Sequence, residues 1–284
     1  MSFKMSIISI QSHVAYGYVG NKAAVYPLQS MGHEVLPINT VQFSNHTGYK
    51  KWQGEIFTRD HIRNIIRGIE DIGADKDCQA ILSGYMGSHE ICSEVFEIVK
   101  KFKSKNENIL YLCDPVIGNT SCYVKPEVLE FFKANLQADI ITPNEFEAEI
   151  LSGIKIKTTK DLKDIAEYFH DRGVKIVVIT GLNLKELSES GLYIFMSDQV
   201  HTFVTRTVEY NFNTPPSGTG DLFSALFLGN YLSTKSAVQS LKRSVYFIDQ
   251  VIKNTFTAKS RELKIISANY ACIDETALPD AIEV

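Results

Sequence analysis

Hydrophobic residues along the chain follow two spacings that alternate with each other. Short continuous apolar runs, such as Met5–Ile10, predict buried strands, and apolar residues three or four positions apart, as in Thr58–Gly73, predict helices. The strands expected from the apolar runs are Met5–Ile10, His33–Thr40, Gln79–Ser83, Asn108–Cys113, Asp139–Thr142 and Lys175–Thr180. The helices expected from the wider spacing are Ala23–Met31, Thr58–Gly73, His89–Phe102, Pro126–Asn135, Asn144–Ser152, Thr159–Arg172, Gly220–Tyr231 and Lys235–Thr255.

Three further segments complete this pattern. Gly191–Met196 and Gln199–Thr205 predict a hairpin. Val41–Phe57, which is rich in Asn, Gly and aromatic residues, predicts a long loop or an irregular segment. The tail after Ile266 is ambiguous. Alternation of strands and helices favours a parallel sheet with helices on both faces. We therefore expect an α/β fold in one domain over residues 1–284, with a mostly parallel central sheet.

Polar residues cluster where the expected strands end. These clusters are Gln11–His13, Asn39–Thr47, Gly84–Gly87, Asp114-Pro115 and Thr142–Glu147. In open α/β sheets, ligands bind beyond the carboxyl ends of the strands. The pattern therefore indicates an enzyme or a ligand-binding protein rather than a scaffold.

Composition argues against a nucleic-acid-binding protein, a membrane protein and a disulfide-bonded protein. The formal charge of −4 gives no support to a nucleic-acid partner, and no apolar run has the length of a membrane span, so no membrane association is expected. The number of cysteines, five, is odd, and no CxxC spacing occurs. This usage fits free thiols in a reducing cytoplasm.

The segment Ser217–Asp221, SGTGD, places a carboxylate close behind two glycines at the expected start of a helix. Glycines let backbone N–H groups approach a ligand, and a helix N-terminus attracts phosphate. Asp221 has two readings at this position. It is a helix cap, or it is a base that takes a proton from a substrate hydroxyl beside an anion-binding turn.

Several motifs resemble those of pyridoxal kinases in the ribokinase-like superfamily, and they occur in order along nearly the whole chain. They are Gln11–Gly20 (QSHVAYGYVG), Asn39–Tyr49 (NTVQFSNHTGY), Leu82–Ser88 (LSGYMGS), Cys113–Gly118 (CDPVIG) and Ser217–Asp221. The resemblance implies a ribokinase-like fold. It also implies that Asp221 deprotonates the acceptor hydroxyl while Gly218, Thr219 and Gly220 build an anion hole for the transferred phosphate.

The same resemblance implies binding roles for other residues. The substrate-side residues would be Ser12 at the pyridine nitrogen, Phe43 and Tyr85 around the ring, and Thr47 with Gly48 at its polar substituents. The residues on the ATP side would be Asp114, Thr142, Asn144, Glu147, Thr180, Arg206, Thr207 and Val208. Asp114 and Glu147 would bind Mg²⁺, which takes few protein ligands besides water and phosphate oxygens.

Each of these residues also has a structural reading. Ser12 could cap a turn, the aromatic residues could belong to the core, and Asp114 could form a turn. We expect His46 to be structural rather than catalytic. Cys122 lies in NTSCYVK, where pyridoxal kinases carry a lid, and it is either incidental or a thiol that reacts with an aldehyde substrate.

The resemblance implies transfer of the γ-phosphate of ATP to the 5′-hydroxyl of pyridoxal. It further implies Mg²⁺ with ATP, a monovalent cation such as K⁺, related B6 vitamers as substrates, and a homodimer. One alternative is a hydroxymethylpyrimidine kinase, although such kinases open with a Gly-rich run where this chain has Gln11–Val14. The other is a vitamin B6 binding or carrier protein with little turnover.

Overall fold

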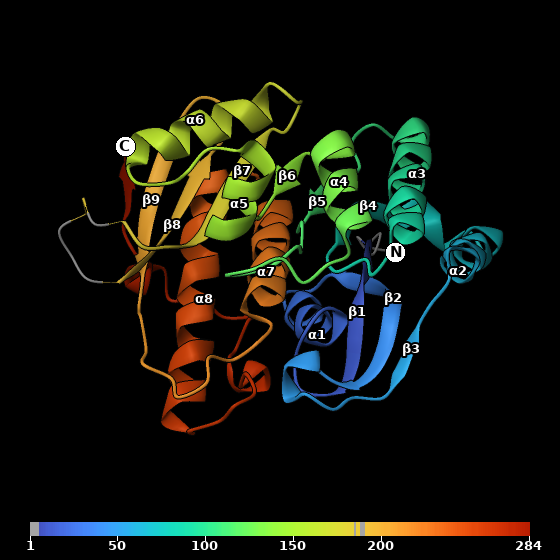
Figure 1. Ribbon diagram of the computed structural model, residues 1–284, viewed down its shortest axis with the longest axis horizontal. Coiled ribbons are helices and arrows are strands. Elements are labelled where there is room, and N and C mark those ends of the chain that lie inside the picture. The colour runs from blue at the N-terminus through green and yellow to red at the C-terminus, as the bar shows by residue number, and fades with distance from the viewer. Residues whose placement is uncertain (1–5, 185, 188–190) are drawn as a thin grey trace.

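A single mixed β-sheet runs through the computed structural model, which describes residues 6–184, 186–187 and 191–284 (Figure 1). The strands are β1 (Ser6–Tyr16), β2 (Glu34–Asn45), β3 (Gly54–Ile56), β4 (Cys78–Ser83), β5 (Leu110–Cys113), β6 (Ile140–Ile141), β7 (Ile176–Leu182), β8 (Leu192–Ser197), β9 (Thr202–Thr207) and β10 (Ala281–Glu283). Their order across the sheet is β10-β9-β8-β7-β6-β5-β4-β1-β2-β3. The strands from β2 to β7 in this order are parallel, and antiparallel strands flank them. The predicted mostly parallel α/β fold is confirmed.

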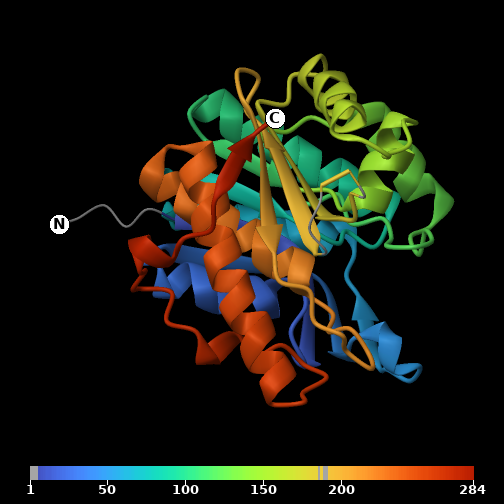
Figure 2. The ribbon, with the colours of Figure 1, turned by 90° about the vertical axis from the view of Figure 1, so that its left-hand side faces the viewer.

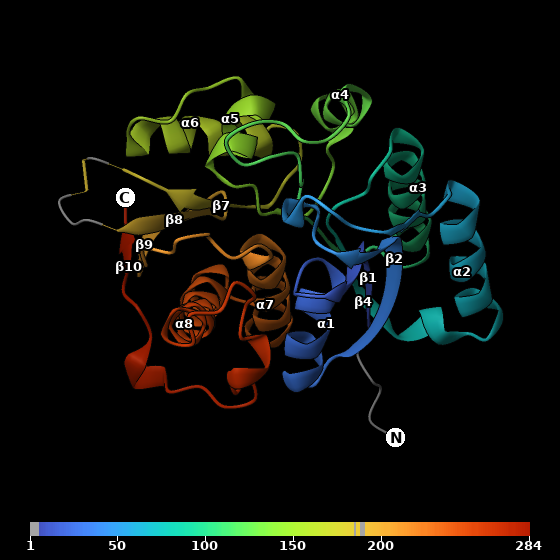
Figure 3. The ribbon, with the colours of Figure 1, turned by 60° about the horizontal axis from the view of Figure 1, so that its bottom comes forward.

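Helices cover both faces of the sheet (Figure 3). They are α1 (Asn21–Ser30), α2 (Arg59–Asp71), α3 (His89–Lys105), α4 (Pro126–Asn135), α5 (Glu145–Ser152), α6 (Thr159–His170), α7 (Thr219–Thr234) and α8 (Ala237–Thr257). Helices α2 to α6 lie on one face, and α1, α7 and α8 lie on the other. Among the described residues, none of the helices has both the length and the apolar character that a membrane span requires.

Two hydrophobic cores fill the layers because successive strand residues point to opposite faces. Ile8 packs in the core under α2 to α6, whereas its neighbour Ile7 packs in the core under α1, α7 and α8. Helix α7 is buried along almost its whole length, between the sheet, α1 and α8. This burial explains why its sequence is apolar all round rather than on one stripe.

Two expectations at the start of the chain are wrong. The first strand does not end at Ile10 but continues to Tyr16, so Gln11–His13 lies within β1 (Met5 lies outside the described residues). Val41–Phe57 is not a long loop, because β2 continues to Asn45 and β3 pairs with it antiparallel. The reason for both is mutual pairing: the extension of β1 finds its backbone partners on the extension of β2.

Antiparallel strands from the second half of the chain extend the sheet at the edge away from β3. The predicted hairpin of β8 and β9 is confirmed. The tail, which the sequence left ambiguous, adds β10 to the far edge, where Ile282 is opposite Val204 of β9 (Figure 2).

A buried ion-pair group at the amino ends of the strands ties α3 to the sheet. The carboxylate of Asp139 accepts the backbone N–H of Tyr111 at 2.8 Å, lies 2.9 Å from Lys175 Nζ, and accepts a hydrogen bond from Lys103 of α3. Burial acts to raise the pKa of Asp139, but these donors outweigh it and lower the pKa. The ionised carboxylate is therefore stabilised in the folded chain.

Replacement of this carboxylate, Asp139→Asn, is expected to lower the free energy of unfolding at pH 7 by about 1.5–3 kcal/mol, the typical value of hydrogen bonds to a charged group. Because the folded-state pKa of Asp139 is depressed, the advantage of the parent chain is complete above the unfolded pKa of about 4 and disappears as pH falls through the folded value. Urea denaturation from pH 7 to about pH 2 measures this convergence. Equal stability of the two chains at pH 7 would contradict the assignment.

Candidate active site

The carboxyl ends of the parallel strands form one edge, and backbone hydrogen bonds align the residues that follow them. The N–H of Asp114 donates to the carbonyl of Ser83 at 2.9 Å, and the N–H of Thr142 donates to that of Cys113 at 3.3 Å. Thr180 lies in β7, and its N–H donates to the carbonyl of Pro143 at 3.0 Å. The residues expected on the ATP side therefore start from neighbouring strands.

The turn into α7 requires glycine at position 218. Gly218 has φ 91°, and a Cβ at this position would lie 1.9 Å from the carbonyl oxygen of Tyr18. The first N–H groups of α7 have no partner within the helix, so they face the site with the positive end of the helix dipole. Asp221 lies in this first turn. Burial raises its pKa, and the backbone N–H of Gly20 opposes that rise.

Ser224 links Asp114 to the start of α7. Its hydroxyl lies 3.1 Å from Asp114 Oδ2, 2.7 Å from Thr142 Oγ1 and 2.9 Å from the carbonyl oxygen of Gly220. Sequence reasoning missed this residue. Its position three residues after Asp221, on the same face of the helix, was the available signal.

Glu147 is buried at the start of α5 and is saturated by backbone donors. Its Oε1 accepts the N–H groups of Ile117 and Gly118 at 2.8 and 3.2 Å, and its Oε2 accepts the N–H of Asn144 at 3.0 Å. Asn144 caps the helix in return and donates to the carbonyl of Gly118 at 2.8 Å. Burial raises the pKa of Glu147 to about 7 in spite of these donors.

Three carboxylates therefore converge on the same region. Burial, followed by the charges of Glu147 and Asp221, raises the pKa of Asp114 well above its ordinary value. Such mutual repulsion is relieved by a cation. Within residues 6–184, 186–187 and 191–284, no group of three or more His, Cys, Asp or Glu side chains is arranged to hold a metal ion by itself. The carboxylates fit a Mg²⁺ ion that receives its remaining ligands from phosphate and water.

The residues expected around a substrate ring lie beside a small apolar cluster. Phe43 is buried with Val14, Val19 and Val41, and Tyr85 packs against them. Ser12 lies close to Gly20, since a Cβ at position 20 would approach Ser12 Oγ to 2.4 Å. Gly20 also faces Asp221. Ser12 and the carboxylate of Asp221 therefore flank the same glycine.

Sequence reasoning missed Trp52, whose ring lies 4.3 Å from that of Phe43 between centroids. Thr47 and Gly48 lie in a 3₁₀ turn that follows β2. His46 caps this turn, because its Nδ1 accepts the N–H of Gly48 at 3.1 Å and lies 3.3 Å from Ser217 Oγ. Burial lowers the pKa of His46. These contacts give His46 a structural role.

Arg206, Thr207 and Val208 lie at the carboxyl end of β9, which points in the same direction as β7. Thr207 donates to the carboxylate of Asp249 in α8, and the N–H of Val208 lies 3.4 Å from the same oxygen. The side chain of Thr207 is thus held within the protein. Its backbone remains at the edge that carries the site.

Cys122 lies in a turn over this edge and pairs with Gly118 through a bridge of the backbone. The thiol is exposed, and it lies 3.5 Å from the carbonyl oxygen of Val124.

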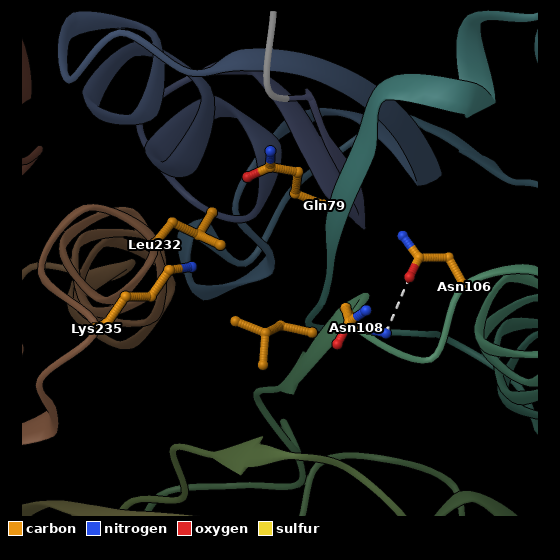
Figure 4. A pocket seen from close by; sticks show the side chains of 6 residues that line it. Gln79, Asn106, Asn108, Leu232 and Lys235 are labelled. Atoms are coloured by element: carbon orange, nitrogen blue, oxygen red, sulfur yellow. Dashed lines mark hydrogen bonds between the residues drawn. The ribbon is translucent and has the colours of Figure 1, made fainter. Parts of the chain in front are cut away.

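A cavity of about 240 Å³ lies at the opposite edge of the sheet (Figure 4). Its lining residues come from the amino ends of β4 and β5, the end of α3 and the end of α7: Gln79, Asn106, Asn108, Leu110, Leu232 and Lys235. The side chain of Asn106 caps the turn after α3, because its Oδ1 accepts the N–H of Asn108 at 3.1 Å. None of the residues that converge on Asp221 belongs to this cavity.

Known proteins resemble this chain over most of its length. A family model described as phosphomethylpyrimidine kinase matches residues 33–265. The pyridoxal kinase PdxY of Corynebacterium diphtheriae is 39% identical over 271 residues, which cover 94% of this chain and 95% of that protein. The PdxY protein of Granulibacter bethesdensis is also 39% identical, over 93% of this chain and 94% of its own length.

Solved structures extend the likeness to three dimensions. The pyridoxal kinase of Leishmania donovani in complex with ADP and ginkgotoxin matches with a TM-score of 0.90 and 29% identity, over 99% of both chains. The predicted ribokinase-like fold and the predicted resemblance are thereby confirmed. Because the chain is 39% identical to curated pyridoxal kinases over nearly its whole length, and because a solved pyridoxal kinase has the same fold, the chain belongs to the pyridoxal kinase family.

Proposed function

We propose that this chain is an ATP-dependent kinase that transfers the γ-phosphate of ATP to the 5′-hydroxyl of pyridoxal and so forms pyridoxal 5′-phosphate in vitamin B6 salvage. The observation that carries the proposal is the position of Asp221 in the first turn of α7. It lies next to the anion-binding turn at Gly218 and, through Gly20, next to Ser12 on the substrate side. In this proposal, the base, the anion hole and the ring pocket lie side by side at the start of α7.

Asp221 acts as the general base. Its burial raises its pKa, which brings the carboxylate closer to the working pH and makes it a better proton acceptor. The backbone N–H groups of Gly218, Thr219 and Gly220 receive the transferred phosphoryl group. They are preorganised, since the turn is held against Tyr18 and cannot relax when charge develops.

The substrate ring lies between Phe43 and Tyr85, with Ser12 at the pyridine nitrogen. Thr47 and Gly48 contact the polar substituents of the ring. The small apolar cluster around Phe43 supports this placement, because a ring pocket needs an apolar wall with a few polar groups at its rim. Pyridoxine and pyridoxamine differ from pyridoxal only at one substituent, so the same pocket accommodates them.

The nucleotide lies along the ends of β5 to β9. Its phosphates face Asp114, Thr142 and Asn144, and Thr180 with residues 206–208 forms the side that holds the nucleoside. Asp114 would hold Mg²⁺, whereas Glu147, whose oxygens accept three backbone N–H groups, would act on the ion through water. Bound Mg²⁺ would neutralise negative charge on the phosphates. A monovalent cation such as K⁺ is the second cation that we propose for the reaction.

We place the protein in the cytoplasm as a homodimer. All of Cys78, Cys92, Cys113, Cys122 and Cys272 are free thiols, as a reducing compartment requires. The dimer rests on the resemblance to pyridoxal kinases.

The purified chain with ATP and Mg²⁺ is expected to convert pyridoxal to pyridoxal 5′-phosphate at about 0.1–10 s⁻¹, at or below the usual enzyme median. The absorbance of the product measures the rate. Hydroxymethylpyrimidine is the matched second substrate, because the matching family model is named for phosphomethylpyrimidine kinases. Faster turnover of hydroxymethylpyrimidine would identify that compound, rather than pyridoxal, as the preferred substrate. Pyridoxal binding without turnover would identify a carrier.

Asp221→Asn keeps the size of the side chain but removes the base. We expect kcat to fall by about 10²–10⁴, the usual contribution of a positioned general base, while KM for pyridoxal changes far less. Steady-state kinetics of both chains, with circular dichroism to verify folding, measure the difference. A near-normal kcat in the variant would rule out Asp221 as the base.

A further inference from the structure

The carboxylate of Glu262, in the segment after α8, joins two parts of the chain that border the site. Its Oε1 accepts a hydrogen bond from the hydroxyl of Tyr49, and its Oε2 accepts the backbone N–H of Tyr18 at 3.3 Å. Tyr49 ends the 3₁₀ turn that carries Thr47 and Gly48. Tyr18 lies between β1 and α1. Both oxygens of Glu262 are therefore engaged by segments far away in the sequence.

Arg261 strengthens the same contact from the other side of the ring. Its guanidinium lies 3.6 Å from the centroid of Tyr49, and it donates to the carbonyl oxygen of Gly48 at 2.9 Å. A guanidinium at this distance from an aromatic face is attracted by the ring. Partial burial and the Glu262 carboxylate raise the pKa of Tyr49 to about 12, so its hydroxyl remains a donor at neutral pH.

The contact continues from Tyr18 to the anion-binding turn. The carbonyl oxygen of Tyr18 lies against Gly218, where a Cβ would approach it to 1.9 Å. Gly17 also lies close to Glu262, since a Cβ at position 17 would be 2.3 Å from Glu262 Oε2. The turn at His46 lies 3.3 Å from Ser217, from ring nitrogen to hydroxyl oxygen, and Figure 2 shows this part of the chain beside the segment that enters α7.

We propose that Glu262, assisted by Arg261, is a positioning residue for phosphoryl transfer. It holds the segment 46–53, which we name the flap, at a fixed place relative to the anion-binding turn at Gly218. The proposal rests on the proposed function, in which Thr47 and Gly48 of the flap contact pyridoxal. Glu262 itself touches neither substrate nor phosphate. Its effect reaches the reaction through Tyr49 on one side and Tyr18 on the other.

The kinetic test compares Glu262→Ala with the parent chain. Loss of both acceptors is expected to raise KM for pyridoxal roughly tenfold, as loss of a hydrogen bond to a charged group does. KM for ATP should stay within about twofold, because the nucleotide lies at the ends of other strands. Glu262→Gln should be intermediate, since its one carbonyl oxygen replaces only one acceptor. Tyr49→Phe, which keeps the ring under Arg261, is a second variant if Glu262→Ala does not fold.

A spectroscopic readout follows the flap without using activity. Trp52 is the one tryptophan of the chain, and it lies in the flap against Phe43. Release of the flap in Glu262→Ala should increase the quenching of Trp52 fluorescence by acrylamide. Glu275→Gln is the matched control. It removes a carboxylate of the same C-terminal region whose partner, Arg243, lies on α8 away from the flap, so it should leave quenching and both KM values unchanged.

A selective rise in KM for pyridoxal together with greater Trp52 quenching supports the positioning role. An unchanged KM for pyridoxal, or an equal rise in both KM values with a lowered Tm, overturns it in favour of a purely structural role. If the parent chain does not phosphorylate pyridoxal, the proposed function fails. The comparison of Trp52 quenching then decides whether Glu262 holds the flap, and equal quenching in parent and variant overturns that as well.

Discussion

Burial of α7 between the sheet, α1 and α8 fixes the place of Asp221, and the arrangement of the site depends on it. A helix enclosed by apolar contacts on all sides cannot shift along its axis without opening the core. Its first turn therefore stands at a constant place beside the strand ends. Ser224 adds a polar tie within the same helix, because it contacts both Asp114 and Thr142. Asp221 and Asp114 are thus held in place by one rigid element.

Burial of the three carboxylates at the site raises the cost of keeping them ionised. Burial raises the pKa of Asp114, Glu147 and Asp221. The charge of Asp221 adds to the rise at Asp114 and Glu147, and the charge of Glu147 adds to the rise at Asp114. In the folded chain by itself, this repulsion favours protonated carboxyl groups. A Mg²⁺ ion bound with ATP would favour the ionised forms. In the proposed reaction, the nucleotide complex therefore helps to make the base competent, in addition to supplying the phosphoryl group.

The flap, unlike α7, lies outside the two large hydrophobic cores. The extensions of β1 and β2 pair with each other past the point where β1 loses its pairing with β4, and β3 adds only a short third strand. A small ribbon of this kind is marginal by itself. Contacts from the C-terminal segment to Gly48 and Tyr49 supply the missing attachment. The last part of the chain thereby stabilises a loop that belongs to its beginning.

The sequence by itself determined the layered architecture, since the two hydrophobic spacings respond only to which face of an element is buried. The motif at Ser217–Asp221 likewise located the helix that carries Asp221, because glycine and aspartate at a helix start are local signals. The sequence could not reveal the extensions of β1 and β2, β10, or the partners of Ser224, because these depend on pairing and packing between distant segments. The contact of Glu262 with Tyr49 and Tyr18 is of the same kind: an ordinary glutamate after a helix has no local signature. Only the tertiary structure decides which donors it meets, because side chains far apart in sequence become neighbours when the core forms.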